Sequence, residues 1–433
     1  MQYLPNILFA ALLIFGIGFF IRNVKKLSRN INLGKPIDRS DHKEQRWKNM
    51  INIALGQSKM VSRPIAGILH IIVYVGFIII NIEVLEIIID GLFGTHRVLS
   101  FLGSFYSFLI NSFEILAVLV LVAVIVFWIR RMVLRIPRFW NKEMMGFPKN
   151  DALNILYFEM VLMTLFLIMN ATDTQFQEAN SGNIISQFIA PLFGSLSVES
   201  LHLIERSAWW LHIAGILIFL NYLYYSKHLH ILLAFPNTYY ANLNAKGKLD
   251  NLESVTNEVK LMMDPNTDPF AAPAESESSE AVEKFGAEDI MDLNWVQLMN
   301  AYTCTECGRC TSVCPANITG KELSPRAIMM KTRDRVEEVG KNIDKNSKFV
   351  DDGKSLLDTI NAEELWACTS CNACVEECPV SIDPLSIIMD MRRFQVMEKS
   401  AAPQELNMMM TNIENNGAPW QYNQMDRLNW KDE

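Results

Sequence analysis

The chain from Cys304 to Pro315 reads CTECGRCTSVCP, and the pattern returns from Cys368 to Pro379 as CTSCNACVEECP. Each copy has the form C-x2-C-x2-C-x3-C-P, which is typical of the ligands of a pair of [4Fe–4S] clusters. Three closely spaced thiolates on a tight loop bind three irons of one cluster. The fourth cysteine, which precedes a proline, binds the other cluster. The motif therefore predicts two clusters that tie both copies into one unit.

The expected ligand sets cross between the two copies. One cluster takes Cys304, Cys307, Cys310 and Cys378, and the other takes Cys368, Cys371, Cys374 and Cys314. All eight cysteines of the chain fall within these motifs, so none is left over for another role. Structural zinc sites fit less well, because their C-x2-C pairs are separated by a longer loop.

Apolar residues are concentrated in the first half of the chain. The 433 residues are 50% hydrophobic, and five runs before Pro236 are each near the length that crosses a hydrocarbon core of about 30 Å. These runs predict membrane-spanning helices at about 4–21, 65–89, 110–129, 152–170 and 207–228. No comparable run follows Pro236, which predicts a soluble second half.

The sequence therefore predicts an all-α protein, in which a five-helix transmembrane bundle precedes a soluble α-helical ferredoxin-like domain. The expected segments are a membrane domain at 1–236, an acidic linker at 237–292, a two-cluster domain at 293–398 and a tail toward a partner subunit at 399–433. Within the linker, residues 245–292 hold 12 acidic and 4 basic residues. Such a composition buries too little apolar surface to order itself.

Lysine and arginine alternate between the loops. The loop at 22–63 carries eleven of them, whereas the loop at 171–205 carries none. Because basic loops stay in the cytoplasm, this pattern predicts a bacterial inner-membrane protein with its amino terminus outside and its cysteine motifs in the cytoplasm. The cytoplasm also keeps thiols reduced. The net charge of −8 and the lack of a basic stripe argue against a nucleic-acid partner.

Four histidines fall in or beside the predicted spans. His70 lies near the inner end of the second span, His212 near the outer end of the fifth, and His228 and His230 at the inner end of the fifth. In one regular helix, the eighteen residues from His212 to His230 make five turns, so both would share a face about 27 Å apart. This spacing suits two b-type haems, and His228 would point to a different face.

The inner haem site is the more complete of the two. His70 and His230 lie at similar depth, and imidazoles from two facing helices give a six-coordinate haem. His212 has no histidine partner on the second span. His96 and His202, both in outside loops, remain candidates, or the outer iron is five-coordinate or absent. One haem is therefore expected, and a second stays open.

Three acidic residues, Glu83, Glu86 and Asp90, fall on one face of the second span toward its outer end. Ionisable side chains inside a membrane are costly and usually functional, so these carboxylates are candidates for passing protons to or from a quinone. The alternative is that they are solvated residues at a helix end.

The fifth span carries a resemblance to a known family. Its residues 209–212, 226–232 and Pro236-Asn237 resemble the last helix of the membrane domain of heterodisulfide-reductase-like iron–sulfur oxidoreductases. That domain is similar to the haem-binding gamma subunit of respiratory nitrate reductase, and relatives include electron-transfer-flavoprotein:quinone oxidoreductases of the iron–sulfur type. The resemblance implies that His70 and His230 bind the inner haem, and it matches His212 to the outer haem on one side only.

The resemblance also implies a function and a partner. Large members of the family continue into a domain with CCG motifs, and we expect a separate subunit to supply that domain here. The expected protein is an oxidoreductase subunit of a respiratory chain. It relays electrons between a cytoplasmic donor, such as electron-transfer flavoprotein, and membrane quinone, in either direction. The alternatives are a membrane-anchored subunit of a heterodisulfide or sulfur-compound reductase, and a redox scaffold that does not react with quinone.

Overall fold

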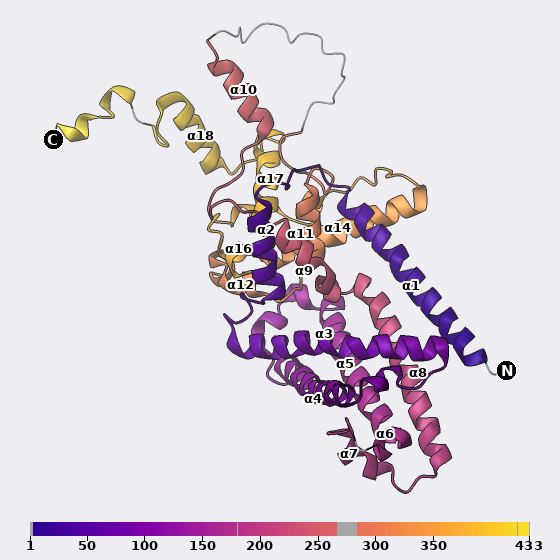
Figure 1. Ribbon diagram of the computed structural model, residues 1–433. Coiled ribbons are helices and arrows are strands. Elements are labelled where there is room, and N and C mark those ends of the chain that lie inside the picture. Colours follow the sequence, from indigo (N-terminus) through magenta and orange to yellow (C-terminus); the bar gives the residue numbers. More distant parts are fainter. Residues whose placement is uncertain (1–2, 180, 266–283, 422, 433) are drawn as a thin grey trace.

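The computed structural model describes residues 3–179, 181–265, 284–421 and 423–432, which form helices and no strands (Figure 1). The all-α prediction is therefore confirmed. The acidic serine and glutamate run at 275–280, which was predicted to lie in a linker, falls outside the described residues.

Five long apolar helices form the first half of the chain. They are α1 (Leu4–Ile31), α3 (Pro64–Phe93), α4 (Ser104–Met132), α5 (Phe147–Thr172) and α8 (Val198–Tyr222). Each is long and apolar enough to cross a membrane. Most of these helices extend beyond the predicted apolar runs. An apolar run marks only the part at hydrocarbon depth, and polar residues can continue the helix into the interface.

The long helices pack in sequence order, and α1 closes the arrangement. α3 packs on α4, α4 on α5 and α5 on α8, while α1 contacts both α3 and α8. In Figure 1, α3 runs across the view whereas α8 runs steeply down it, so these two helices cross. Close approach of α1 and α3 depends on Gly91, where a Cβ atom would lie only 2.5 Å from the Phe9 ring.

Short elements join the long helices. They are α2 (Lys43–Met50), η1 (Ile51–Leu55), η2 (Val98–Leu102), η3 (Pro137–Phe139), η4 (Lys142–Met144), α6 (Thr174–Glu178), α7 (Ser186–Ile189) and η5 (Ala190–Phe193). α6 and α7 lie at the end of the molecule farthest from the second half of the chain (Figure 1). α2 is fixed by Arg46, which is 1% exposed and donates to the carbonyl oxygens of Tyr239 and Ala241.

The fifth long helix is shorter at its inner end than predicted. α8 ends at Tyr222, and it is followed by η6 (Leu223–Tyr225), η7 (Lys227–Leu229) and α9 (His230–Tyr239). Ser226 has an extended backbone, and its side chain accepts a hydrogen bond from the His228 amide at 3.0 Å. A serine side chain that bonds the backbone in this way competes with the helix. The prediction of one regular helix from His212 to His230 was therefore wrong.

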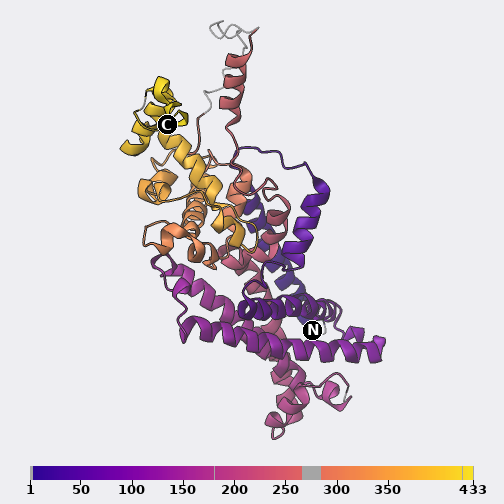
Figure 2. The same ribbon diagram turned by 90° about the vertical axis from the view of Figure 1, so that its left-hand side faces the viewer.

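The second half of the chain folds into a helical domain, whose core also includes Leu27, Ala54, Leu229 and Ala234 from the first half. Its helices are α10 (Glu253–Met263), α11 (Trp295–Thr303), α12 (Arg309–Val313), α13 (Pro315–Ile318), α14 (Pro325–Asn346), η8 (Leu356–Asp358), α15 (Ala362–Trp366), α16 (Ala373–Glu377) and α17 (Pro384–Met397). α18 (Gln404–Asn416), η9 (Gln424–Asp426) and η10 (Asn429–Lys431) follow. α10 projects away from the long apolar helices in both views (Figures 1 and 2).

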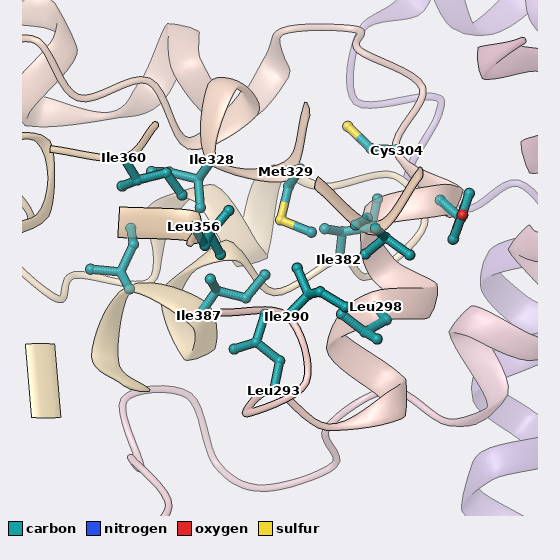
Figure 3. Packing of buried hydrophobic residues seen from close by; sticks show 14 of the residues in the cluster. Ile290, Leu293, Leu298, Cys304, Ile328, Met329, Leu356, Ile360, Ile382 and Ile387 are labelled. Atoms are coloured by element: carbon teal, nitrogen blue, oxygen red, sulfur yellow. The ribbon is translucent and has the colours of Figure 1, made fainter. Parts of the chain in front are cut away.

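Buried aliphatic side chains fill this domain and reach the first cysteine motif. Figure 3 shows Leu298, Ile328 and Leu356 in the core, with Met329 and Ile382 extending it toward Cys304. Ala287 and Ile290 are fully buried in the same core, although both were predicted to lie in the linker. The residues around Ala287 and Ile290 therefore belong to the domain and not to the predicted linker.

Candidate electron-transfer site

The two cysteine motifs adopt the same loop conformation. Glu306 and Ser370, each two residues after the first cysteine, have left-handed φ angles of 53° and 55°. Gly308 and Asn372, two residues further on, have φ angles of 71° and 58°. These turns curl each loop, and the helices that follow, α12 and α16, pack against each other. The repeat in the sequence is thus a repeat in the structure.

The two cysteine motifs approach each other in the fold. One cavity is lined by Cys304, Cys307, Cys310 and Cys378, and also by Cys374. Cys314, from the first copy, lies within electrostatic range of Cys368 and Cys374 from the second copy. The last cysteine of each motif therefore faces the loop of the other motif.

The donor set fits iron–sulfur clusters better than single metal ions. Among the described residues, no three cysteine, histidine or acidic side chains converge on a point that could hold one ion. A four-iron cluster does not require such convergence, because each thiolate binds a different iron. Burial raises the pKa of Cys304 to about 12 and that of Cys378 to about 11, so cluster assembly must release the thiol protons.

The loop of the first motif is anchored to the membrane half by a buried carboxylate. Glu306 is 3% exposed, and it accepts hydrogen bonds from Lys227 and, at 2.8 Å, from Arg333. Burial alone would raise the pKa of Glu306, but the charges of Lys227 and Arg333 hold it below its ordinary value. The segment that carries His228 and His230 is thereby tied to the segment between the first two cysteines.

Two arginine side chains make further contacts between the first cysteine motif and the first half of the chain. Arg309 donates to the carbonyl oxygens of Lys59 at 2.8 Å and Met60 at 3.2 Å, just before α3. Arg326, which is fully buried, donates to the Arg138 carbonyl and to the Glu143 carboxylate, both at 2.7 Å. These contacts hold the first cysteine loop against the segments before α3 and after α4.

His70 and His230 are brought together as predicted, although not by a continuous helix. Their ring centres are 6.3 Å apart, with the planes inclined by 39°. Metal–imidazole bonds of about 2 Å on each side of one metal place two ring centres about 6 Å apart. His228 also joins this group, because its ring stacks on that of His230 at 5.3 Å. The prediction that His228 points to a different face was wrong, since it rested on a regular helix.

The hydrogen bonds of these rings suit metal binding. His230 Nδ1 lies 3.0 Å from the Lys227 carbonyl, which can only accept, so Nδ1 carries the hydrogen and Nε2 is free. Nδ1 of His70 is buried and has no partner among the described residues. Burial lowers the pKa of His230, which favours the neutral form that ligates metals. Both imidazoles are therefore suited to metal binding.

His212 has no second imidazole beside it. Its side chain is 2% exposed, and Nδ1 donates to the Leu162 carbonyl at 3.0 Å. His96 instead lies 3.1 Å from an Asp173 oxygen, and His202 is 73% exposed near Glu205. Neither lines the cavity next to His212 in the part of the chain that the structure describes. An outer haem with two histidine ligands is thus not supported.

The three carboxylates of α3 are buried. Glu83, Glu86 and Asp90 line one cavity beside the loop that follows α3. Glu86 accepts from the Leu99 amide at 2.9 Å, and Asp90 accepts from the Arg97 amide at 2.7 Å. Both carboxylates therefore hold the loop after α3. Glu83 Oε2 has no partner among the described residues, and it remains the candidate for proton transfer.

Several functional candidates were missed by the sequence analysis. Lys227 and Glu306 are 79 residues apart, so only the fold reveals their contact. Arg97, the single basic residue of its loop, bonds Asp173 at 2.9 Å. Burial would raise the pKa of Asp173, but His96 and Arg97 lower it well below its usual range. Glu159 was detectable, because it is a lone acidic residue within an apolar run.

Comparisons with known proteins agree with this picture. The model of the 4Fe–4S dicluster domain family matches residues 303–382. A probable iron–sulfur-binding oxidoreductase, FadF, of Bacillus subtilis is 29% identical over 99% of this chain and 61% of its own length. The EtfAB:quinone oxidoreductase of Syntrophomonas wolfei is 26% identical over 92% of this chain and 55% of its own length. A protein of Archaeoglobus profundus that is like a heterodisulfide reductase subunit is 32% identical over 29% of this chain and 54% of its own length.

These matches confirm the resemblance to heterodisulfide-reductase-like iron–sulfur oxidoreductases. They support an oxidoreductase role in electron transfer and the presence of [4Fe–4S] clusters. The chain spans only 61% and 55% of the length of its two long relatives. No solved structure matches this chain significantly.

Proposed function

We propose that the protein is a membrane-bound electron-transfer subunit that connects a cytoplasmic electron donor with membrane quinone. In this proposal the eight cysteines bind two [4Fe–4S] clusters, and His70 and His230 bind one b-type haem. When bound, these groups supply one-electron transfer, and the protein supplies binding, orientation and a dry environment. The Syntrophomonas wolfei relative is an EtfAB:quinone oxidoreductase, which supports the quinone link.

The observation that carries this proposal is the direct joint between the cysteine loop and the imidazole pair. The backbone carbonyl of Lys227 orients His230, and the ammonium group of the same residue bonds Glu306, between Cys304 and Cys307. Arg309, next to Cys310, lies within electrostatic range of His70. The cysteines of the first motif and the imidazole pair are thus joined through a single residue, Lys227. Such closeness suits electron transfer between the groups that they would bind.

The membrane orientation and the partner belong to the same proposal. The basic loops at 22–63 and 130–149 flank the soluble domain, so this domain faces the cytoplasm of a bacterial inner membrane. Electrons would enter from electron-transfer flavoprotein or another soluble donor through a CCG-type iron–sulfur subunit. The heterodisulfide reductase-like relative favours such a partner.

A count of metal centres tests the proposal. The purified full-length protein should hold about eight irons in clusters and one haem per chain, with a reduced-minus-oxidised spectrum typical of a b-type haem. His70→Ala and His230→Ala should each abolish the haem band, whereas His42→Ala, on an exposed loop residue, should leave it unchanged. A wild-type protein without haem would overturn the quinone relay.

A second candidate function is a subunit of a heterodisulfide or sulfur-compound reductase, which the Archaeoglobus profundus relative favours. This candidate predicts that the reduced protein passes electrons to a disulfide or sulfur substrate through its partner and that added quinone does not reoxidise the haem. A membrane-anchored scaffold predicts instead that no haem is present. Stopped-flow mixing of the reduced protein with each acceptor separates the three.

A further inference from the structure

A cavity lies among the long helices beside His212. Its walls come from α3, α4, α5 and α8, and they are mostly aliphatic and aromatic. Three polar side chains line it, namely His212, Glu159 and Asn81. Its enclosed volume is about 70 Å³, and its mouth is open to the surroundings. An apolar cavity with a few convergent polar groups is typical of a site for a small organic ligand.

His212 is held ready for a ligand in this cavity. Its Nδ1–H bond to the Leu162 carbonyl leaves Nε2 with a free lone pair, and the Phe166 ring, 6.2 Å away, supports the imidazole. The other six histidines of the chain lie elsewhere. His70, His228 and His230 form one group, His96 pairs with Asp173, and His42 and His202 are exposed.

Glu159 brings a second proton-carrying group to the same cavity. Its side chain is half-buried, and no salt bridge or hydrogen bond of its carboxyl group is found among the described residues. Carboxyl groups at such depth in a membrane protein are rare and usually have a function. Together, Glu159 and His212 give the cavity two groups that can each exchange one proton.

The cavity is close both to the exposed surface of the bundle and to the group of three histidines. Phe77, which lines it from α3, is 40% exposed on the outer surface of the bundle, so a lipid-soluble molecule can enter from the side. Phe219 lines the opposite part, and its ring lies 5.4 Å from the ring of His228. His228 in turn stacks on His230. One phenylalanine ring and one imidazole ring thus separate the cavity from His230.

From these contacts we propose that the His212 cavity binds the head group of the membrane quinone, and that His212 is not a ligand of a second haem. The inference rests on the function proposed above. Reduction of a quinone to a quinol adds two electrons and two protons, one proton to each carbonyl oxygen. His212 exchanges one proton at Nε2, and Glu159 exchanges the other at its carboxyl group. The electrons arrive singly from the iron centres of the relay, or return there when quinol is oxidised.

The test uses the full-length protein in lipid nanodiscs, with the quinol analogue heptyl-hydroxyquinoline N-oxide as a fluorescent probe. The wild-type protein should bind one probe per chain. His212→Leu and Ile216→Phe, which fills the cavity without touching a proton-carrying group, should weaken binding about tenfold or more. Glu159→Gln should slow reoxidation of the reduced haem by a short-tailed naphthoquinone about a hundredfold. His202→Asn, a change at an exposed histidine, should behave as the wild type.

Haem content decides between the two roles of His212. All four variants should retain the wild-type haem content and spectrum. Loss of a haem from His212→Leu would overturn the inference and assign His212 to iron, and so would unchanged probe binding in both His212→Leu and Ile216→Phe. Probe binding needs no turnover, so it tests the cavity even if the wild-type protein fails to react with quinone. That failure would instead contradict the proposed function.

Discussion

At the scale of single residues, a buried ion pair shows where the two halves of the chain meet, and no sequence motif predicts it. Lys227 is 8% exposed and Glu306 is 3% exposed, and neither is near the other in sequence. A charge is stable inside a protein only when it is paired and hydrogen-bonded. The pair therefore fixes how the segment before His228 meets the first cysteine loop.

Replacing this lysine tests the joint. Lys227→Met should destabilise the protein by about 2 kcal/mol, because Glu306 loses a charged hydrogen-bond donor and keeps only Arg333. Thermal unfolding in detergent measures the loss. The matched control is Lys246→Met, which removes an exposed ion pair with Glu376 and should change stability by less than about 0.5 kcal/mol. Equal effects of the two variants would show that the Lys227 contact has no special role.

The pair of Glu143 and Arg326 gives a pH-dependent prediction. Burial would raise the pKa of Glu143, but the hydrogen bond from Arg326 lowers it below its ordinary value of 4.5. A carboxyl group with a lowered folded-state pKa stabilises the fold above its unfolded pKa, and this contribution is lost as the pH falls through the folded value.

Glu143→Gln should therefore be less stable than the wild type by about 1–3 kcal/mol near pH 7, because Arg326 is left buried without a counter-ion. The difference should shrink as the pH falls below about 4.5. Melting temperatures of both proteins across this range check the trend. Glu44→Gln, on an exposed side chain of α2, serves as the control and should show no such trend. A constant difference at every pH would contradict the prediction.

The sequence predicted the cysteine groups because their spacing is short and local. Three ligands within seven residues define a loop whatever the rest of the fold does. Glu159 could have been predicted for the same reason, since a lone carboxylate stands out in an apolar run. Lys227 could not, because its role depends on a contact between segments that are distant in the sequence.

At the scale of elements, apolar length predicted the five long helices but not where the last one ends. No glycine or proline occurs between Leu223 and Leu229, so composition gives no signal for the break. The break nevertheless brings His228 and His230 together and turns them toward His70. A regular helix would have separated the two histidines around its axis.

Packing of α1 on α3 gives a prediction at this scale. Gly91→Val should destabilise the protein by about 1–3 kcal/mol, because the new side chain would overlap the Phe9 ring and force the helices apart. Gly18→Ala is the control, since no atom lies within 4 Å of the added Cβ atom. It should leave stability unchanged or raise it by up to about 1 kcal/mol. Adding Phe9→Ala to Gly91→Val should recover part of the loss, and no recovery would contradict the steric explanation.

At the scale of the whole molecule, the two halves of the chain meet at the contact between Lys227 and Glu306. A row of aromatic and imidazole rings lies next to this contact. The row begins at His70 and His230, continues through His228 and Phe219, and ends at the cavity beside His212. Composition predicted both halves, but not this row of rings within the first half. Such an alignment depends on packing between α3, α8 and α9, which local patterns do not encode.

The orientation of this row in the membrane is the last prediction. The loop at 22–63 carries eleven basic residues and the loop at 171–205 carries none, so the first should face the cytoplasm and the second the outside. Two exposed positions, Lys43 and Ser195, report on these loops. In intact cells, a membrane-impermeant thiol reagent should label Ser195→Cys and should not label Lys43→Cys, and inverted membrane vesicles should reverse this pattern. Labelling of the unsubstituted protein measures the background from the native cysteines, and this background is subtracted. Labelling of Lys43→Cys in intact cells would place the soluble domain outside, away from any cytoplasmic donor, and would contradict the proposed relay.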